Sequence, residues 1–285
     1  MVSFLPGAGK WRGTCRIVNA AGLHERGSMR AASARGTAGD RMTDYDIAHV
    51  SLRGDRGQNQ DRLGWRVRDQ NLLMVLADGM GGHPRGELAA AAAVQCVMRM
   101  FQDAAPSRAG SAGFLHDALL EAHSEVVAQG RAVSPPVAPH TTCIAARVAR
   151  GGVDWAYVGD SRLYLLRNDG TWLRTRDHNA AEELYQLGSI SAEERRHHPL
   201  RHQVTRALGG DQTPTPESGS GPGLAPGDLL LLCSDGLLAL PESRILAGLR
   251  DTAPLGGILP ALGAEAVRAA HPHSDNVSVL ALRWR

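Results

Sequence analysis

The stretch Val75-Leu76-Ala77-Asp78-Gly79-Met80-Gly81-Gly82-His83 joins an apolar run to a glycine-rich loop. The apolar residues 72–77 have the length of one buried strand, so Asp78 lies where that strand is predicted to end. A carboxylate in this position suits a hard cation, and Gly79 can leave the usual φ range and turn its carbonyl toward the ion. A lone Asp-Gly pair is more often a tight turn. Three later segments of the same kind favour the cation site in this chain.

Those three segments each place an aspartate beside an apolar run of strand length, at Asp160, Asp235 and Asp275. Together with Asp61, these carboxylates are expected to converge with Asp78 on one end of the sheets. Oxygen ligands without cysteine favour Mg²⁺ or Mn²⁺ over zinc or copper. Because several carboxylates in one site repel one another unless cations hold them, we expect at least two ions. A pair of metal ions is the usual device for hydrolysing a phosphoester.

The composition is that of a globular protein with little net charge. The chain has 285 residues, 43% of them hydrophobic, and a formal net charge of +2. This length allows one large core, and the sequence shows no basic stripe of the kind that indicates a nucleic-acid partner. The four cysteines are far apart and form no CxxC pair, which predicts a reduced, cytoplasmic protein without disulfides. No apolar run approaches the roughly 18 residues of an integral membrane helix.

Residues 1–43 differ from the rest of the sequence. They are rich in Gly, Ala, Ser and Arg, and they show no sustained hydrophobic periodicity. This composition predicts a disordered basic leader. Two alternatives stay open: a mis-assigned start, because Met29 and Met42 could each begin the product, and a basic arm for targeting or membrane contact.

The remaining residues, 44–285, predict one folded domain. Strands are expected at 47–52, 64–68, 72–77, 141–148, 154–158, 162–167, 171–174, 228–233 and 277–284, and helices at 85–103, 111–130, 241–249 and 255–270. Strands come first, then a helix pair, more strands, a second helix pair and a last strand. This order indicates an α+β fold of two sheets flanked by helix pairs rather than a βαβ repeat.

Seven motifs occur along this domain. They are Arg56-x-x-Asn59-Gln60-Asp61, Ala77-Asp78-Gly79-Met80-Gly81-Gly82-His83, Thr141-Thr142, Val158-Gly159-Asp160-Ser161-Arg162, Asp177-His178, Ser234-Asp235-Gly236-Leu237 and Asp275-Asn276-Val277-Ser278. In this order they resemble the protein phosphatase 2C (PPM) family, most of all its single-domain bacterial serine/threonine phosphatases. The resemblance covers residues 46–285. It implies a central antiparallel β-sandwich flanked by helix pairs, in four layers α-β-β-α, with the metal site at one edge of the sandwich.

The resemblance also implies a set of metal ligands. Asp78 would bridge two core ions, Mn²⁺ or Mg²⁺, and the carbonyl of Gly79 would be a further ligand. Asp235 and Asp275 would complete the shell of the first ion. Asp160, with Asp235, would hold a third and weaker ion.

Two further residues receive catalytic roles from the resemblance. Asp61 would orient metal-bound water from just outside the set of direct ligands. A water that bridges the two ions held by Asp78 would attack phosphorus. Arg56 would bind the substrate phosphate, since a guanidinium can make two parallel hydrogen bonds to phosphate oxygens. From its position alone, Arg56 would equally suit a surface ion pair with Asp55 or Asp61.

Two residues depart from the family pattern. Gln60 stands where many relatives carry Glu, and Met80 stands where eukaryotic relatives carry a histidine proposed as general acid. His83 is a candidate acid, although a loop histidine that holds the glycine turn is the preferred interpretation.

Residues 179–203 correspond to the family's flap beside the active site. This segment is the most highly charged part of the domain. Its histidines at 197, 198 and 202 have an unpromising spacing for a metal, because His198 precedes Pro199 and a helix is disfavoured there. A lid that contacts the protein substrate is the preferred interpretation.

The resemblance implies a metal-dependent protein serine/threonine phosphatase that acts on phosphoserine and phosphothreonine and counteracts a bacterial serine/threonine kinase. The expected partners are phosphorylated proteins and that kinase, and the expected state is a monomer. A non-catalytic phosphoprotein-binding regulator on the same fold is the alternative, but degenerate relatives usually lose metal aspartates and this chain keeps them. A small-molecule phosphohydrolase is a third possibility, which phosphopeptide substrates would distinguish.

Overall fold

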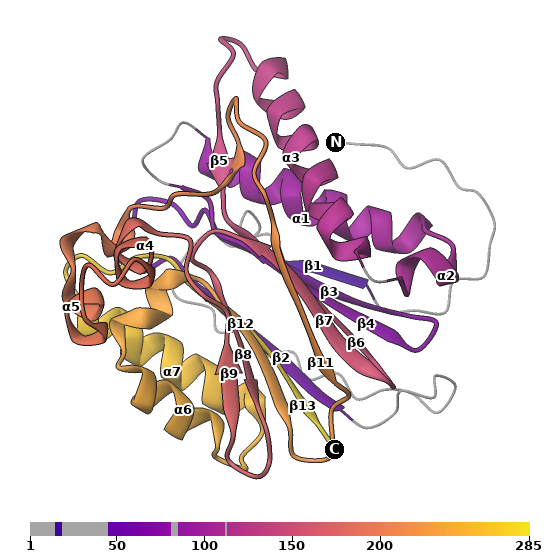
Figure 1. Cartoon of the computed structure of the whole chain (residues 1–285), viewed down its shortest axis with the longest axis vertical. Coiled ribbons are helices and arrows are strands. Elements are labelled where there is room, and N and C mark those ends of the chain that lie inside the picture. Colours follow the sequence, from indigo (N-terminus) through magenta and orange to yellow (C-terminus); the bar gives the residue numbers. More distant parts are fainter. Residues whose placement is uncertain (1–14, 19–44, 81–84, 112) are drawn as a thin grey trace.

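The structure is a computed structural model that describes residues 15–18, 45–80, 85–111 and 113–285. Two antiparallel sheets lie face to face (Figure 1). The first sheet has the strand order β1 (Cys15–Val18), β3 (Arg62–Arg68), β4 (Asn71–Ala77), β6 (Cys143–Ala149), β7 (Gly152–Val158) and β11 (Glu217–Pro222). The second has the order β2 (Tyr45–Leu52), β13 (Val277–Trp284), β12 (Leu229–Cys233), β8 (Arg162–Leu166) and β9 (Trp172–Arg174). A small third sheet pairs β5 (His140–Thr141) with β10 (Leu208–Gly209).

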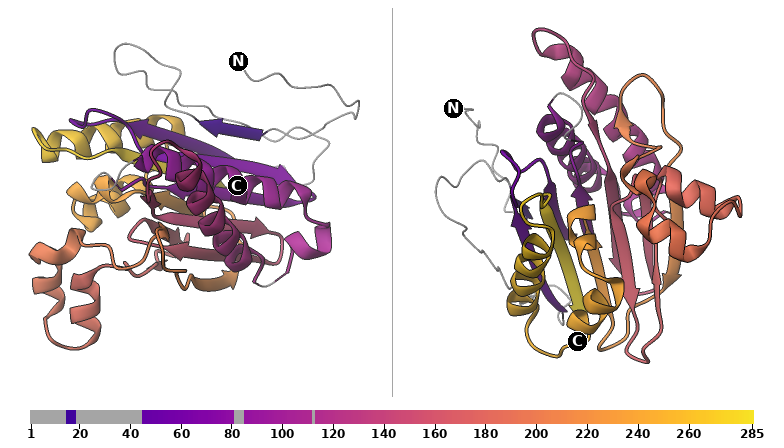
Figure 2. Two further views of the ribbon diagram at one scale, coloured as in Figure 1. Left: turned by 90° about the horizontal axis from the view of Figure 1, so that it is seen from above. Right: turned by 90° about the vertical axis from the view of Figure 1, so that its left-hand side faces the viewer.

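Helices cover the outer face of each large sheet. Helices α1 (Gly86–Asp103) and α3 (Phe114–Ala132) pack on the first sheet, and α6 (Glu242–Leu249) and α7 (Leu255–Ala270) pack on the second (Figure 2). A separate apolar cluster fills the space between the two sheets. The predicted α+β sandwich with four layers α-β-β-α is therefore confirmed.

The most apolar strands occupy the middle of this sandwich. In β4, every residue from Leu72 to Ala77 is buried, and the same holds for all five residues of β12. Each of these strands has neighbouring strands on both sides, the other large sheet on one face and helices on the other, so an unbroken apolar run is stable there. Strand β4 ends at Ala77, and the next residue is the first predicted site aspartate.

Helix α1 owes its close packing to its alanines. Five consecutive alanines, 89–93, include four buried residues that let the helix lie against the sheet and against α3. Its carboxyl end is held by Arg68 of β3, whose guanidinium donates to the carbonyl oxygens of Phe101 (2.9 Å), Gln102 and Ala104 (2.7 Å). A cation there satisfies carbonyls that have no partner within the helix and complements the helix dipole.

Three of the differences from the sequence prediction concern the larger elements and the leader. The expected helix 111–130 begins at Phe114, preceded by the short helix α2 (Pro106–Ala109), because Pro106 starts a helical turn that ends at Gly110. Strand β11 was not expected, since its sequence ESGSGP has no hydrophobic alternation; it is an edge strand that pairs with β7. Strand β1 lies inside the leader for which no regular structure was expected, where a β-branched Ile17-Val18 pair favours a strand against β3. The other leader residues lie outside the described ones.

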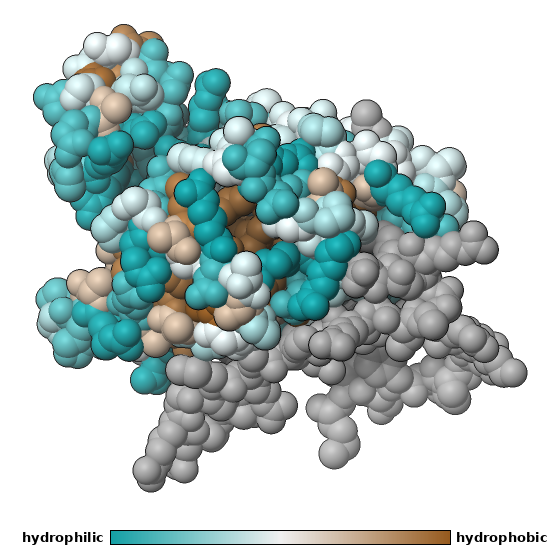
Figure 3. Space-filling view, turned by 90° about the horizontal axis from the view of Figure 1, so that it is seen from below, coloured by the Kyte–Doolittle hydropathy of each residue, from teal (hydrophilic) through white to brown (hydrophobic). Residues whose placement is uncertain are grey.

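The flap segment folds as three short helices that project from the body. They are α4 (Ala180–Gln186), α5 (Ala192–His197) and the 3-10 helix η2 (Pro199–His202) (Figure 1). The face seen from below is largely hydrophilic around a smaller apolar area (Figure 3). None of the described helices combines the length and the apolar composition that crossing a bilayer requires.

Candidate metal centre

The structure brings the five predicted aspartates together at one end of the sandwich. Asp61 directly precedes β3, Asp78 follows β4, Asp160 lies between β7 and β8, Asp235 follows β12, and Asp275 precedes β13. Burial and, in decreasing order, the charges of Asp61, Asp235, Asp160 and Asp275 raise the pKa of Asp78 well above its usual value. Asp78 therefore lies at the centre of the group.

Two threonines hold Asp78 in place. The Asp78 carbonyl accepts hydrogen bonds from Thr141 Oγ1 (2.8 Å) and the Thr142 N–H (2.9 Å), and the Asp78 N–H donates to Thr142 Oγ1 (3.1 Å). Thr142 Oγ1 is also 2.8 Å from Ser161 Oγ, beside Asp160. The Thr141-Thr142 motif, to which the sequence assigned no role, thus connects the loops that carry Asp78 and Asp160.

Gly79 is required for a reason different from the predicted one. Its φ lies outside the left-handed region, so conformational freedom is not the cause, and the prediction of an unusual φ is wrong. A Cβ at Gly79 would lie 2.4 Å from the Gly86 carbonyl oxygen and 2.9 Å from that of Gln60. The start of α1 and the Gln60 loop therefore approach the Gly79 backbone too closely for any side chain.

Substituting Gly79 by Ala is expected to destabilise the domain by about 1–3 kcal/mol, the usual cost of forcing an extra methyl group into a packed region. Both clashing atoms belong to the backbone, so no side-chain rotation relieves them. Thermal unfolding of the chelator-treated protein measures the effect. Gly57→Ala is the matched control, because a Cβ at Gly57 meets nothing within 4 Å. Equal stability of the two variants would contradict this explanation.

Asp61 is the most deeply buried of the five carboxylates, with 1% of its surface exposed. Its Oδ2 accepts a hydrogen bond from Ser234 Oγ (2.9 Å), whereas its Oδ1 has no hydrogen-bond partner among the described residues. Burial raises the pKa of Asp61 to about 6, against the opposing effect of hydrogen bonds that involve Ser278, Ser234 and Asp78. A buried carboxylate oxygen without a partner is costly unless a further group binds it.

Asp160 and Asp235 lie beside the flap. Burial, then the charges of Asp235 and Asp177, raise the pKa of Asp160, which is 4% exposed. Asp235 begins the 3-10 helix η3 (Asp235–Ala239), and its Oδ2 is 3.8 Å from Nδ1 of His202 in η2. The sequence pattern indicates His202 only as part of a metal motif, whereas the structure places its ring within ion-pair distance of Asp235.

Arg56 forms an ion pair with Asp275, 2.7 Å between Nη2 and Oδ2, and with neither Asp55 nor Asp61. Asn276 holds the Arg56 loop: its amide donates to the carbonyls of Arg53 (2.7 Å) and Gln58 (3.0 Å) and accepts from the Gln60 N–H (2.8 Å). About half of the Arg56 side chain is exposed (53%). The guanidinium therefore lies at the rim of the carboxylate group, where a phosphate from solution can reach it.

The residues present fit hard divalent cations. Within the described residues, no set of three or more His, Cys, Asp and Glu side chains is arranged to hold an ion by itself, so backbone carbonyls or water must contribute ligands. Mg²⁺ and similar ions commonly keep several waters and use only one or two carboxylates each. The mutual repulsion around Asp78 and the unpaired Oδ1 of Asp61 are the features that bound cations would relieve.

Gln60 and Met80, the two residues that depart from the family pattern, make different contacts in the structure. Gln60 donates its amide to Glu87 Oε2 (3.4 Å) at the start of α1, where a glutamate would face a second carboxylate. Met80 donates its N–H to the His140 carbonyl (3.0 Å) and is partly buried. His83 lies outside the described residues, so its role as an acid stays a prediction.

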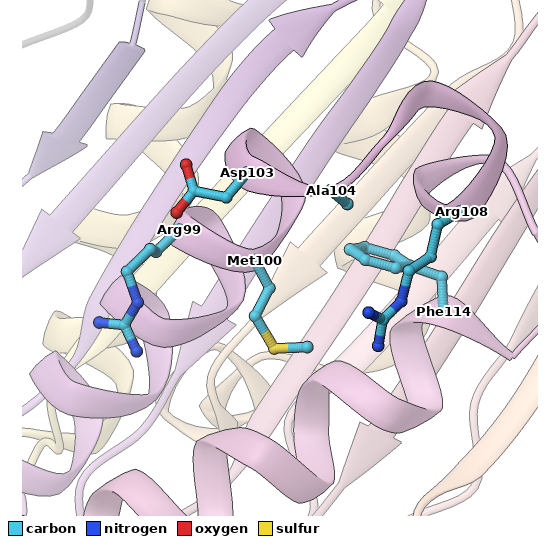
Figure 4. A pocket seen from close by; sticks show the side chains of 6 residues that line it. All are labelled: Arg99, Met100, Asp103, Ala104, Arg108 and Phe114. Carbon is cyan, nitrogen blue, oxygen red and sulfur yellow. The ribbon is translucent and has the colours of Figure 1, made fainter.

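A cavity of about 230 Å³ lies elsewhere, between α1, α2 and α3 (Figure 4). It is lined by Arg99, Met100, Asp103, Ala104, Arg108 and Phe114. None of the five site aspartates lines this cavity, so it is separate from the candidate metal centre at the end of the sandwich.

Known proteins resemble the chain in both sequence and structure. The family model "Protein phosphatase 2C" matches residues 51–260. The serine/threonine phosphatase Stp of Listeria innocua is 33% identical over 205 residues, which cover 69% of this chain and 81% of that protein. The catalytic domain of the phosphatase PstP, solved in complex with two manganese ions, is 29% identical and superposes with a TM-score of 0.70 over 84% of this chain and 98% of its own. Staphylococcus aureus Stp1 gives 0.76 at 25% identity, over 88% of this chain and 100% of its own. The chain belongs to the protein phosphatase 2C family.

Proposed function

We propose that the protein is a metal-dependent protein serine/threonine phosphatase that uses Mn²⁺ or Mg²⁺. The observation that carries this proposal is the convergence of four aspartates on Asp78, with Arg56 at the rim of the same group. The relatives named serine/threonine phosphatases, and the manganese ions in the PstP structure, support it.

The residues divide into ligands and substrate contacts. Asp78, the Gly79 carbonyl, Asp235 and Asp275 would hold two core ions, and Asp160 with Asp235 would hold a third. Bound ions supply the Lewis acidity that activates water and stabilises charge on the transferred phosphoryl group. Asp61, whose buried Oδ1 has no partner within the part of the chain that the structure describes, would orient the attacking water by accepting its proton in a hydrogen bond. Arg56 would hold two oxygens of the substrate phosphate.

The experiment that tests this proposal uses the full chain after treatment with a chelator. Mn²⁺, Mg²⁺, Ca²⁺ or Zn²⁺ is then added back separately, and hydrolysis of a phosphothreonine peptide and of p-nitrophenyl phosphate is measured. Activity restored by Mn²⁺ or Mg²⁺ and absent in Asp235→Asn is the expected result. A folded protein that binds the phosphopeptide but hydrolyses nothing with any ion would instead identify a non-catalytic regulator.

Arg56→Ala is expected to raise KM for the phosphopeptide about tenfold or more with a smaller change in kcat, because a charge-assisted bond to phosphate contributes about 1.5–3 kcal/mol of binding. Steady-state kinetics at saturating Mn²⁺ measure both constants. Arg56→Lys is the control. It keeps the charge but loses the planar pair of donors, so its KM should lie between those of wild type and Arg56→Ala. An unchanged KM in Arg56→Ala would assign Arg56 to the structural ion pair with Asp275 alone.

The substrates, the partner and the location of the protein are proposed only as classes. Phosphorylated proteins, a cognate serine/threonine kinase and a monomeric, cytoplasmic enzyme agree with the family resemblance. The three cysteines whose side chains are described, Cys96, Cys143 and Cys233, are free and buried, which agrees with a reducing compartment. Size-exclusion chromatography with light scattering tests the monomer.

A further inference from the structure

The Asp177-His178 motif lies at the base of the flap and has no role in the site described above. His178 is almost fully buried, with 4% of its surface exposed, and its ring stacks on Tyr157 with 4.7 Å between the ring centres. The preceding residue, Asp177, is fixed by Arg162 through two bonds, 2.7 and 2.6 Å. The segment that enters the flap is therefore anchored on the strand that follows Asp160.

His178 binds Gly159 from both sides of its peptide backbone. The Gly159 N–H donates to His178 Nδ1 (3.1 Å), and the His178 N–H donates to the Gly159 carbonyl (3.0 Å). Gly159 has a φ of +110°, a conformation that L side chains rarely adopt, and it directly precedes Asp160. The backbone just before Asp160 is thus held by His178 in a conformation that glycine permits.

The same histidine joins the two ends of the flap. Its carbonyl accepts the Thr205 N–H (2.9 Å), and two residues further along the Ala180 N–H donates to the Gln203 carbonyl (3.0 Å). Asn179 and Val204 form an antiparallel bridge between these bonds. The entry and exit of the flap are therefore paired as a short ladder, and His178 is the residue of that ladder that also contacts the Asp160 loop.

The hydrogen bonds determine the tautomer of the ring. A backbone N–H can only donate, so Nδ1 must accept and the proton must be on Nε2. Nε2 is 3.4 Å from Oε2 of Glu217 on β11, which suits a donor. Burial, followed by the charge of Arg206, lowers the pKa of His178 and favours this neutral form against the opposing effect of Glu217 and Asp177.

We propose that His178 is a positioning residue that fixes the Gly159 peptide beside Asp160 and couples it to the base of the flap. A displacement of the flap is then transmitted to the Asp160 carboxylate, and the ion held there in turn stabilises one flap position. The part that concerns Asp160 as a ligand rests on the proposed function, whereas the mechanical coupling rests on the contacts alone.

Amide hydrogen exchange of the full, chelator-treated chain tests the coupling without any activity measurement. His178→Ala is expected to speed exchange about tenfold at Gly159, whose N–H loses its side-chain acceptor. Exchange at Thr205 should also rise, because its bond to the His178 carbonyl belongs to the ladder that the ring holds in place. His178→Asn should keep Gly159 protected, because its Oδ1 can take the place of Nδ1. His178→Gln, whose oxygen extends toward Glu217, should not. If the alanine variant fails to fold, the difference between Asn and Gln decides.

The matched control is His123→Ala. His123 is another buried histidine whose Nδ1 accepts a glycine N–H, that of Gly209 at 3.1 Å, but it lies on α3 and bonds the β10 backbone rather than Gly159. Its loss should speed exchange at Gly209 and leave Gly159 unchanged. Equal protection of Gly159 and Thr205 in wild type, His178→Ala and His178→Gln would overturn the proposal.

Titration calorimetry with Mn²⁺ extends the test to the ion. His178→Ala is expected to weaken the most weakly bound ion about tenfold, as for residues that orient a metal ligand indirectly, and His178→Asn to restore it. Asp160→Ala separates the two ideas: if it binds Mn²⁺ like wild type, Asp160 is not a ligand and the third ion site assigned under the proposed function is wrong. If Asp160→Ala loses the ion but His178→Ala keeps both its affinity and its amide protection, the positioning role is wrong.

Discussion

The Asp78→Asn variant is expected to lose about 10⁴-fold in kcat/KM for a phosphothreonine peptide at saturating Mn²⁺, a typical cost of removing one member of a group that acts as a unit. The charges of the other four carboxylates all act on Asp78. Cations bound at the centre of the group would therefore interact strongly with the Asp78 carboxylate. An amide of nearly the same shape removes that charge and keeps the packing.

Asp117→Asn on α3 is the control for this variant, because that carboxylate is 63% exposed and lies outside the site. Its activity should be that of wild type. Asp235→Asn should resemble Asp78→Asn, since Asp235 is proposed to contact two ions. Turnover near the wild-type value in either site variant would refute the assignment of the metal centre.

The chelator-treated protein is expected to become less stable as the pH rises from about 4 to about 6, and Asp61→Asn should remove much of this loss. The pKa of Asp61 is raised in the fold from an ordinary value of 3.8 to about 6, because burial disfavours its charged form. A carboxyl with a raised pKa favours the folded state while it is protonated, below its unfolded pKa. That contribution is lost as the pH rises through the folded pKa.

A folded-state pKa that is higher by about two than the unfolded one changes the free energy of unfolding by about 3 kcal/mol. For a domain of this size, that is roughly 5–10 °C in the midpoint of thermal unfolding. Thermal unfolding of wild type and Asp61→Asn in chelator at several pH values measures the difference. Saturating Mn²⁺ should flatten the pH dependence of the wild type, because bound cations favour the charged carboxylates. Parallel curves for the two proteins in chelator would show that Asp61 does not titrate as its burial requires.

The positions of four of the aspartates could be predicted because each lies beside an apolar run, and the end of such a run is visible in the sequence. Asp61 lies in a polar loop, and only the family resemblance indicates it. The arrangement of two sheets flanked by helix pairs could be predicted from the order of apolar runs and amphipathic segments, and the family resemblance implies that the sheets form a four-layer sandwich. Strand β11 could not, since its Gly, Ser and Pro residues carry no alternation and its place depends on the edge of β7.

The contacts that orient the site were beyond local reasoning. Arg56 and Asp275 are 219 residues apart, and nothing in either neighbourhood indicates that they form an ion pair. The need for glycine at position 79 comes from the approach of Gly86 and Gln60, which depends on how α1 meets the sheet. Such constraints arise from tertiary packing. The pattern of apolar runs in the sequence therefore indicates candidate metal ligands but not the contacts that hold them in place.

The position of β13 has a consequence for how the protein is made. This strand leaves the ribosome after β2 and β12, yet it lies between them, with Tyr45 paired to Trp284 and Cys233 to Val279. Asp275 and Asn276, which complete the carboxylate group and hold the Arg56 loop, arrive just before it. A nascent chain that lacks this segment has an open second sheet and an incomplete site, so catalysis can begin only after nearly the whole domain has been synthesised and this strand has inserted.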